Sequence, residues 1–260
     1  MKSKEKIILA VFTILFVGFF LIQNYFKLQS RIVFCDVGQG DGAFINLRGG
    51  AQAVIDGGPD NNMIGCLGKY MPYFDRRIEY LIISHPDADH FVGAIEVLKR
   101  YAVGVVLTNG EAGDSPEYKE FIKLAEGKIA PAASFGFNEG KVNFFNRPDG
   151  KYSDNDNSLV FKFLYSGKSI LFTGDISEKG EALFLKQDLK SDILKISHHG
   201  SAESSSLEFL RAVSPKLAII SVGQGNKFGH PAYKILKRLE NLGIKYLRTD
   251  EKGDIVVNLD

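Results

Sequence analysis

The residues of this chain whose types and spacing could do chemistry are its histidines, which number only five. Each lies at or just after the end of an apolar run that predicts a β-strand, next to glycine, proline or aspartate. Side chains in loops at strand ends often carry function because a rigid sheet positions them. A lone histidine is usually structural, but five in such positions indicate a shared site. They are His85, His90, His198, His199 and His230.

The densest of these segments, HPDADH at residues 85–90, packs two imidazoles and two carboxylates into six residues. Without a cation, Asp87 and Asp89 would repel each other. A divalent metal ion removes that cost and accepts both imidazole nitrogen and carboxylate oxygen as ligands. The segment therefore predicts a metal site with His85, Asp87, Asp89 and His90 as ligands, in preference to a plain polar turn.

Three later segments contain further candidates. Asp175 follows a strongly apolar predicted strand and could bridge two metal ions, although an aspartate there is also a common turn signal. His198 and His199 are adjacent and cannot easily face one ion together. We expect one of them to be a ligand and the other to contact a ligand or the substrate. His230 stands between glycine and proline at the start of a predicted helix.

The elements that must position these residues are short strands and helices in alternation. Their order predicts an α/β fold of two mixed halves, with sheets packed inside and helices outside. The predicted helices cover residues 93–101, 115–126, 178–186, 205–212 and 232–242. The predicted strands cover residues 31–36, 43–47, 51–56, 79–84, 104–108, 142–146, 158–164, 169–173, 192–197, 217–222, 245–248 and 254–258.

The N-terminus has a different composition. Residues 7–22 are uncharged and apolar, and Lys2, Lys4 and Lys6 precede them. A membrane span needs about 20 apolar residues, with about 17 as the lower limit. We expect residues 1–30 to be a single-pass membrane anchor and residues 31–260 to be the catalytic domain. The lysines favour a cytoplasmic N-terminus and hence an extracytoplasmic domain. A cleaved signal peptide and a buried core helix are the alternatives.

The overall charge and the cysteines constrain the function less. Lys and Arg total 32 and Asp and Glu total 31, so the charge does not suggest a surface devoted to nucleic acid, although a local basic patch stays open. Cys35 and Cys66 are not a CxxC pair, which argues against a structural zinc site. They form one disulfide or none, and Cys35 is most simply a small core residue.

The hexad HPDADH resembles the HxHxDH signature of the metallo-β-lactamase fold superfamily. Its aspartate in third place is similar to the hydrolase domain of ComEC-type DNA-uptake proteins. The resemblance covers roughly residues 31–258, and its motifs are specific together although weak singly. The other matching stretches are DVGQGD at 36–41, NDNSLV at 155–160, TGD at 173–175, SHHGS at 197–201, SVG at 221–223 and GHP at 229–231.

The resemblance implies a four-layer αβ/βα sandwich with the metal ions in a cleft at the strand ends. By position, His85 and Asp87 would hold one metal ion, Asp89 and His90 a second, and Asp175 would bridge them.

The same resemblance makes His198 a further ligand or a catalytic group, and it places His230 at the substrate cleft or in a metal site. Two departures matter. Asp87 replaces the usual histidine, and no histidine lies between His90 and His198. An oxygen-rich ligand set favours manganese or magnesium over zinc without excluding zinc. One or two ions are both compatible with this sequence.

ComEC-type proteins also carry a multi-helix channel, so the resemblance implies the hydrolase module and not membership in a DNA-uptake apparatus.

The expected reaction is phosphodiester hydrolysis, with nucleic acid as a candidate substrate. Asp89 or a neighbouring histidine would orient or deprotonate the attacking water. His198, His199 and Lys195 are candidates to contact phosphate or protonate the leaving group. Two alternatives stay open. The chain hydrolyses another ester or an amide, including a β-lactam, or it is a non-catalytic binding module at the membrane.

Overall fold

The computed structural model describes residues 3–146, 152–153 and 155–260, and two seven-stranded sheets form the centre of this part of the chain. The first sheet has the order β14-β1-β2-β3-β4-β5-β6 and the second β13-β12-β11-β10-β9-β8-β7. The strands are β1 (Arg31–Phe34), β2 (Gly42–Leu47), β3 (Ala51–Gly57), β4 (Arg77–Ile82), β5 (Ala102–Thr108), β6 (Ile129–Pro131), β7 (Phe135–Phe137), β8 (Gly140–Phe144), β9 (Phe161–Tyr165), β10 (Lys168–Phe172), β11 (Ile193–Lys195), β12 (Leu217–Ile220), β13 (Lys245–Arg248) and β14 (Ile255–Asn258).

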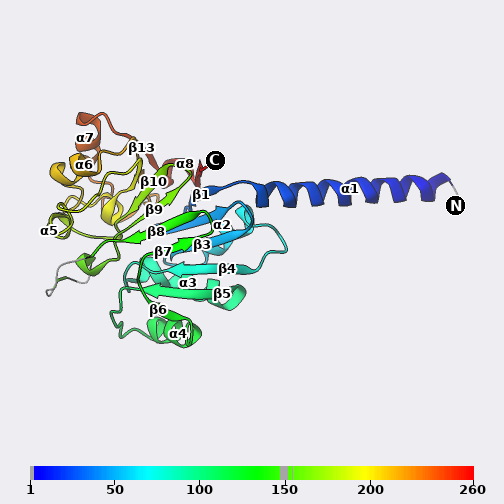
Figure 1. Ribbon diagram of the computed structural model, residues 1–260, viewed down its shortest axis with the longest axis horizontal. Coiled ribbons are helices and arrows are strands. Elements are labelled where there is room, and N and C mark those ends of the chain that lie inside the picture. Colours follow the sequence, from blue (N-terminus) through cyan, green and yellow to red (C-terminus); the bar gives the residue numbers. More distant parts are fainter. Residues whose placement is uncertain (1–2, 147–151, 154) are drawn as a thin grey trace.

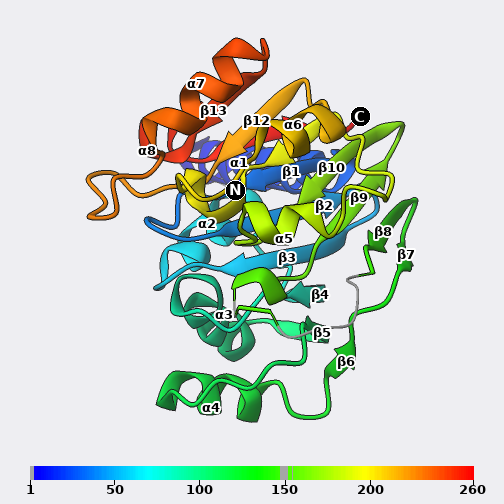
Figure 2. The same ribbon diagram turned by 90° about the vertical axis from the view of Figure 1, so that its left-hand side faces the viewer.

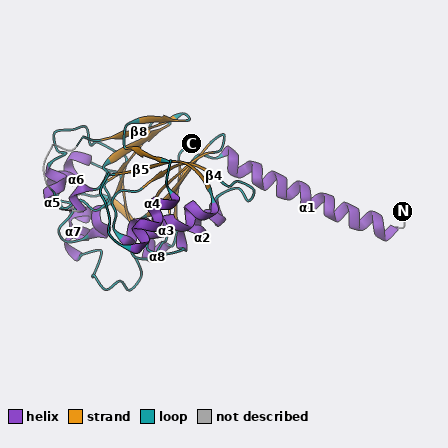
Figure 3. Ribbon diagram, turned by 90° about the horizontal axis from the view of Figure 1, so that it is seen from below, coloured by secondary structure: helices purple, strands orange, loops and turns teal. Residues whose placement is uncertain are grey.

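Helices lie on the outer face of each sheet, as Figures 2 and 3 show. The helices are α1 (Ser3–Leu28), α2 (Asn62–Tyr70), α3 (Ala88–Arg100), α4 (Pro116–Leu124), α5 (Glu178–Ala182), α6 (Leu207–Val213), α7 (Tyr233–Asn241) and α8 (Thr249–Lys252), with short 3₁₀ turns at Asn155–Asn157 and Ser197–Gly200. Three apolar clusters separate the layers: one between the sheets, one under α2 to α4 and one under α5 to α7. The predicted four-layer α/β sandwich is confirmed.

The pairing within each sheet changes from antiparallel to parallel. In the first sheet β14, β1, β2 and β3 pair antiparallel, and β3 to β6 pair parallel. In the second sheet β7 to β10 are antiparallel, and β10 to β13 are parallel. Parallel neighbours end at the same edge of a sheet, so the loops after β3 and β4 lie together, as do those after β10 and β11.

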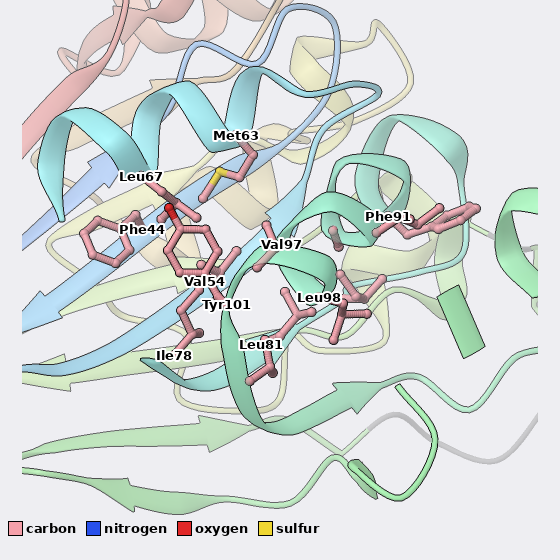
Figure 4. Packing of buried hydrophobic residues seen from close by; sticks show 14 of the residues in the cluster. Phe44, Val54, Met63, Leu67, Ile78, Leu81, Phe91, Val97, Leu98 and Tyr101 are labelled. Carbon is pink, nitrogen blue, oxygen red and sulfur yellow. The ribbon is translucent and has the colours of Figure 1, made fainter. Parts of the chain in front are cut away.

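Helix α3 carries part of the candidate site, and its start differs from the prediction. It begins at Ala88 and not at residue 93, so Asp89 and His90 lie in its first turn instead of a loop. The apolar face of α3, with Phe91 and Val97, packs on the first sheet beside α2 (Figure 4). Burial of this face stabilises the helix more than the weak intrinsic propensity of its first residues opposes it.

The two cysteines form one disulfide. Cys35, just after β1, is bonded to Cys66 on α2, with 5.9 Å between their Cα atoms. Helix α2 was not expected from the sequence. The bond fastens this helix to the loop that leads into residues 36–41.

Helix α1 extends away from the rest of the protein (Figure 1). Its segment Lys4–Ile22 is long and apolar enough to cross a membrane, with a mean hydropathy of 2.3, and none of it is buried inside the protein. The last observation contradicts the alternative of a buried core helix. Lys2, part of the predicted charge pattern, lies outside the described residues.

Candidate metal centre

The ends of four strands bring together residues that lie far apart in the sequence. The hexad at 85–90 follows β4, and Asp56 lies at the end of β3. From the second sheet, Asp175 follows β10, and His198 and His199 follow β11. Because the strands within each pair are parallel, each sheet delivers its polar residues to one edge. The two edges meet in a single buried cluster.

The centre of the cluster is formed by Asp89, His90, Asp175 and His199. One ligand atom from each of them lies within 4.8 Å of the other three. The Nε2 atoms of His90 and His199 are each 3.3 Å from Asp175 Oδ2, and His199 Nε2 is also 3.3 Å from Asp89 Oδ2. All of these residues except Asp89 are fully buried.

Several polar atoms of the cluster face one another without forming hydrogen bonds. Among the described residues, His90 Nε2, His199 Nε2 and Asp175 Oδ1 are buried and have no hydrogen-bond partner. Buried polar atoms without partners are rare in native proteins and need an explanation. Imidazole nitrogens and carboxylate oxygens that converge in this way fit a divalent cation. The geometry of these four residues therefore supports a metal site independently of any sequence motif.

A second histidine–aspartate pair lies beside this cluster. His85 Nε2 is 3.5 Å from Asp87 Oδ2, and the His85 ring centroid is 4.1 Å from that of His90. His85 is fully buried, whereas the Asp87 side chain is 44% exposed. His85 Nε2 also has no hydrogen-bond partner in the described part of the chain. Two histidine–aspartate pairs of the hexad, His85 with Asp87 and His90 with Asp89, therefore lie next to each other.

Two carboxylates that the sequence analysis did not select hold the inner imidazoles in place. Asp56 Oδ2 lies 3.0 Å from His90 Nδ1 and also accepts a hydrogen bond from the Ser84 hydroxyl. His199 Nδ1 makes a hydrogen bond with the Ser221 carbonyl oxygen at 3.1 Å, and Asp41 Oδ1 lies at the same distance as an ion-pair contact. A partner on Nδ1 fixes the ring orientation and aims Nε2 at the cluster, as metal-binding histidines require.

The charges of the cluster also favour a cation. Burial opposes protonation of His199, but the carboxylates of Asp175 and Asp41 outweigh it and hold the pKa of His199 well above its usual value. The same competition, with Asp175 and Asp56, raises the pKa of His90. Burial disfavours charge on Asp175, yet His199 and His90 hold the pKa of its carboxyl well below the usual range. The cluster therefore requires positive charge, which a metal ion supplies in place of protons.

The backbone distinguishes the two adjacent histidines. His198 and His199 both have left-handed φ angles, 50° and 51°, which turn their side chains in different directions. His199 is buried in the cluster, whereas the His198 side chain is 32% exposed and its Nε2 lies 3.8 Å from Asp175 Oδ2. The resemblance made His198 the further ligand or catalytic group, whereas the four-residue cluster contains His199 and His198 lies beside it.

His230 lies next to His198 and outside the four-residue cluster. Its ring is 5.8 Å from that of His198 and is stacked at 5.9 Å on Phe228, which is 57% exposed. The Asn226 side chain holds this loop, because its Oδ1 accepts from the His230 amide and its Nδ2 donates to the His230 carbonyl. Burial and the neighbouring His198 lower the pKa of His230. The imidazole of His230 is therefore neutral at physiological pH.

The predicted role of Lys195 in contacting substrate is wrong. Its ammonium is buried, lies 2.6 Å from Asp41 Oδ2 and donates to the Ile196 carbonyl. The side chain points into the protein because β11 is a central strand whose three residues are all buried. Lys195 therefore reaches the site only through Asp41.

A cavity of about 420 Å³ opens beside Asp87. It is lined by Pro86, Asp87, Glu111, Ala112, Gly113 and Asp114. Three of these residues are acidic, so the cavity is unfavourable for a polyanion in the absence of a cation.

Two facing mixed sheets covered by helices, with histidines and aspartates gathered at the strand ends, define an α/β metal-dependent hydrolase. The chain belongs to the metallo-beta-lactamase superfamily, whose family model matches residues 35–224. This membership implies divalent metal ions.

The curated relatives of this chain include a competence protein. ComE operon protein 3 of Bacillus subtilis (strain 168) is 30% identical over 256 residues, which cover 87% of this chain and 33% of that protein. Competence protein ComA of Neisseria gonorrhoeae is 35% identical over 190 residues, which cover 71% of this chain and 26% of that protein. The chain thus spans between a quarter and a third of the length of these relatives.

Solved structures share the fold. The metallo-beta-lactamase fold protein YhfI from Bacillus subtilis superposes with a TM-score of 0.58 at 11% sequence identity, over 88% of this chain and 99% of that one. At this identity the likeness shows the fold alone.

Proposed function

We propose that this chain is a metal-dependent phosphodiesterase that acts on nucleic acid outside the cytoplasmic membrane, to which α1 anchors it. The observation that carries the proposal is the convergence of His90 Nε2 and His199 Nε2 on Asp175 Oδ2, while both Nε2 atoms and Asp175 Oδ1 are buried without a hydrogen-bond partner. The relatives, which include a competence protein, support nucleic acid as the substrate class.

Within this proposal Asp89, His90, Asp175 and His199 hold a divalent cation, and His85 with Asp87 provides ligands for a second. Such a cation, when bound, activates water at neutral pH and neutralises charge on a phosphodiester.

The chain's own residues supply orientation and proton transfer. Asp89 is the partly exposed member of the central cluster, so its carboxylate is placed to orient the attacking water and accept its proton. His198 and His230 lie next to each other outside the cluster, where the neutral His230 imidazole donates a hydrogen bond to a phosphoryl oxygen and His198 protonates the leaving group. The acidic cavity beside Asp87 disfavours a polyanion, so the substrate approaches from the side of His198 and His230.

The Cys35–Cys66 disulfide supports the extracytoplasmic location. Disulfides persist in oxidising compartments and are rare in the cytosol. The three lysines before the apolar run favour the same topology.

The test uses the full chain purified in detergent, with single- and double-stranded DNA as substrates and manganese, magnesium or zinc added after chelation. We expect metal-dependent cleavage that Asp89→Asn and His199→Ala abolish and that Lys141→Ala, at an exposed position, leaves unchanged. Cleavage that survives Asp89→Ala would overturn the site. Turnover of a carboxylic ester or β-lactam without DNA cleavage would replace the substrate class. A folded chain that binds no divalent ion would indicate the non-catalytic alternative.

A further inference from the structure

The loop between α2 and β4 ends in an exposed aromatic turn. Residues 72–75 form this turn, in which the Asp75 amide donates to the Pro72 carbonyl over 2.9 Å. Tyr73 and Phe74 occupy its corner and are 63% and 76% exposed. The loop projects on the side of the protein from which α1 leaves (Figures 1 and 3). Two adjacent, largely exposed aromatic rings mark an interaction site more often than a solvent-facing surface.

The turn is in contact with the apolar helix. The Phe19 ring lies edge-on to both aromatic rings, with centroids 6.2 Å from Tyr73 and 5.7 Å from Phe74. Phe19 is 38% exposed as a result, whereas the other exposed large apolar side chains of α1 are 48–70% exposed. The aromatic turn and the helix therefore form one continuous apolar surface.

The depth of this contact along the helix follows from helix geometry. The spanning segment Lys4–Ile22 has 19 residues, so at 1.5 Å per residue it is about 28 Å long, close to the hydrocarbon thickness of about 30 Å. Phe19 is three residues from its end, which places it about 5 Å inside the hydrocarbon boundary. Rings in contact with Phe19 must lie at or near that boundary, where aromatic side chains are favoured.

The polar groups around the turn are compatible with a headgroup environment. The Asp75 carboxylate faces the protein, since its oxygens accept from the Arg77 amide and the Gln52 side chain. Arg76 and Arg77 are exposed, and Arg77 is paired with Glu79 at 2.9 Å. Arginines next to exposed aromatic rings suit the interface of a bilayer that contains anionic lipid.

We infer that the turn with Tyr73 and Phe74 is a second membrane contact, which inserts into the lipid interface beside α1. The inference rests on the proposed anchoring by α1 and goes beyond it. One helix alone leaves the domain free to rotate about its tether, whereas two contacts fix the orientation of the catalytic domain relative to the bilayer. The occupant is lipid and not a protein partner, because the rings are continuous with a surface that must itself face lipid.

The chain has no tryptophan, so one introduced tryptophan reports on one position. The full chain with Phe74→Trp is reconstituted into vesicles of phosphatidylcholine and phosphatidylglycerol, with or without brominated acyl chains that quench tryptophan on contact. Phe12→Trp, in the middle of α1, reports insertion of the anchor. Tyr233→Trp, which replaces a 73% exposed ring at the start of α7, is the matched control in solvent.

We expect a blue-shifted emission and quenching by brominated lipid for Phe74→Trp and Phe12→Trp, but not for Tyr233→Trp. Quenching at position 12 without quenching at position 74 would overturn the second contact and leave the anchor standing. The absence of quenching at position 12 would overturn both. A blue shift at position 74 without quenching would show burial against protein, such as a second copy, and would also overturn the inference.

Discussion

The ammonium of Lys195 lies 2.6 Å from the carboxylate of Asp41, and both side chains are buried at the edge of the metal centre. The other oxygen of Asp41 lies 3.1 Å from His199 Nδ1. Burial raises the pKa of Asp41, but Lys195 and His199 outweigh it and lower the pKa to about 2. A lysine on a central strand thus keeps the carboxylate charged beside the inner histidine.

Removal of Lys195 should therefore leave an uncompensated buried charge. We expect Lys195→Met to lower the free energy of unfolding by about 3–5 kcal/mol, the usual cost of breaking a buried pair. The double variant Asp41→Asn with Lys195→Met should recover a large part of the loss. Chemical denaturation of the wild type and of these two variants measures the difference. A loss below about 1 kcal/mol in the single variant would contradict a structural role for the pair.

His198 and His199 should differ in what their removal costs. His199 lies in the centre of the cluster, so His199→Ala should weaken metal binding by more than about 100-fold, beyond the usual effect of losing a residue that only supports a ligand. His198→Ala should lower the turnover of substrate while most of the metal stays bound, because its side chain is partly exposed. Metal content after dialysis distinguishes them, and the reverse order would reject this assignment.

The buried carboxyl group of Glu181 on α5 should make the stability of the protein depend on pH. Its buried carboxylate accepts from the amides of Ser205 and Ser206, yet burial dominates and raises its pKa from 4.5 to about 7. The folded state then binds the proton more tightly than the unfolded state does. Stability should be highest below about pH 4.5 for this group and should fall by about 3 kcal/mol as the pH rises through 7.

Glu181→Gln should remove that pH dependence from the unfolding free energy between pH 5 and 7, roughly the range set by the two pKa values. Its stability should also be lower at acid pH, because an amide cannot satisfy both backbone donors through its oxygen alone. An unchanged pH profile in the variant would show that another group causes the dependence.

The close approach of α3 to the end of β3 can be tested at Gly93. A Cβ atom on Gly93 would lie 2.0 Å from the Gly57 carbonyl oxygen and 2.4 Å from that of Asp60. We expect Gly93→Ala to cost roughly 1–3 kcal/mol or more, because backbone must move. Gly65, on the exposed face of α2, has no atom within 4 Å of such a Cβ and serves as the control. Gly65→Ala should stabilise by roughly 0.5–1 kcal/mol, and equal effects at both positions would contradict the packing.

The sequence predicts the position of the hexad better than its local structure. The apolar run of β4 and the polar residues after it place His85 at a strand end, which is where it lies. Asp and His are weak helix formers, so the first turn of α3 could not be distinguished from a loop. Helix α2 was missed because it is only nine residues long and two of them, Gly65 and Gly68, lower its helix propensity.

The supporting residues were harder to predict because their roles depend on distant contacts. Asp56 and Asp41 resemble ordinary turn residues until the fold places them against His90 and His199. Asp41 could have been selected from the sequence, because it is the last residue of the DVGQGD motif that matches the family. The left-handed backbone that puts His199 inside leaves no trace in residue type.

The central claim is that the cluster of Asp89, His90, Asp175 and His199 holds the cation on which phosphodiester hydrolysis depends. The most direct measurement is the rate of cleavage of a labelled DNA strand by the metal-stripped full chain as manganese is added, compared with His199→Ala. The account predicts that wild-type cleavage is absent after chelation and rises with added metal to a plateau, and that the variant stays inactive. Cleavage that persists in chelator, or an equal response in His199→Ala, would contradict it.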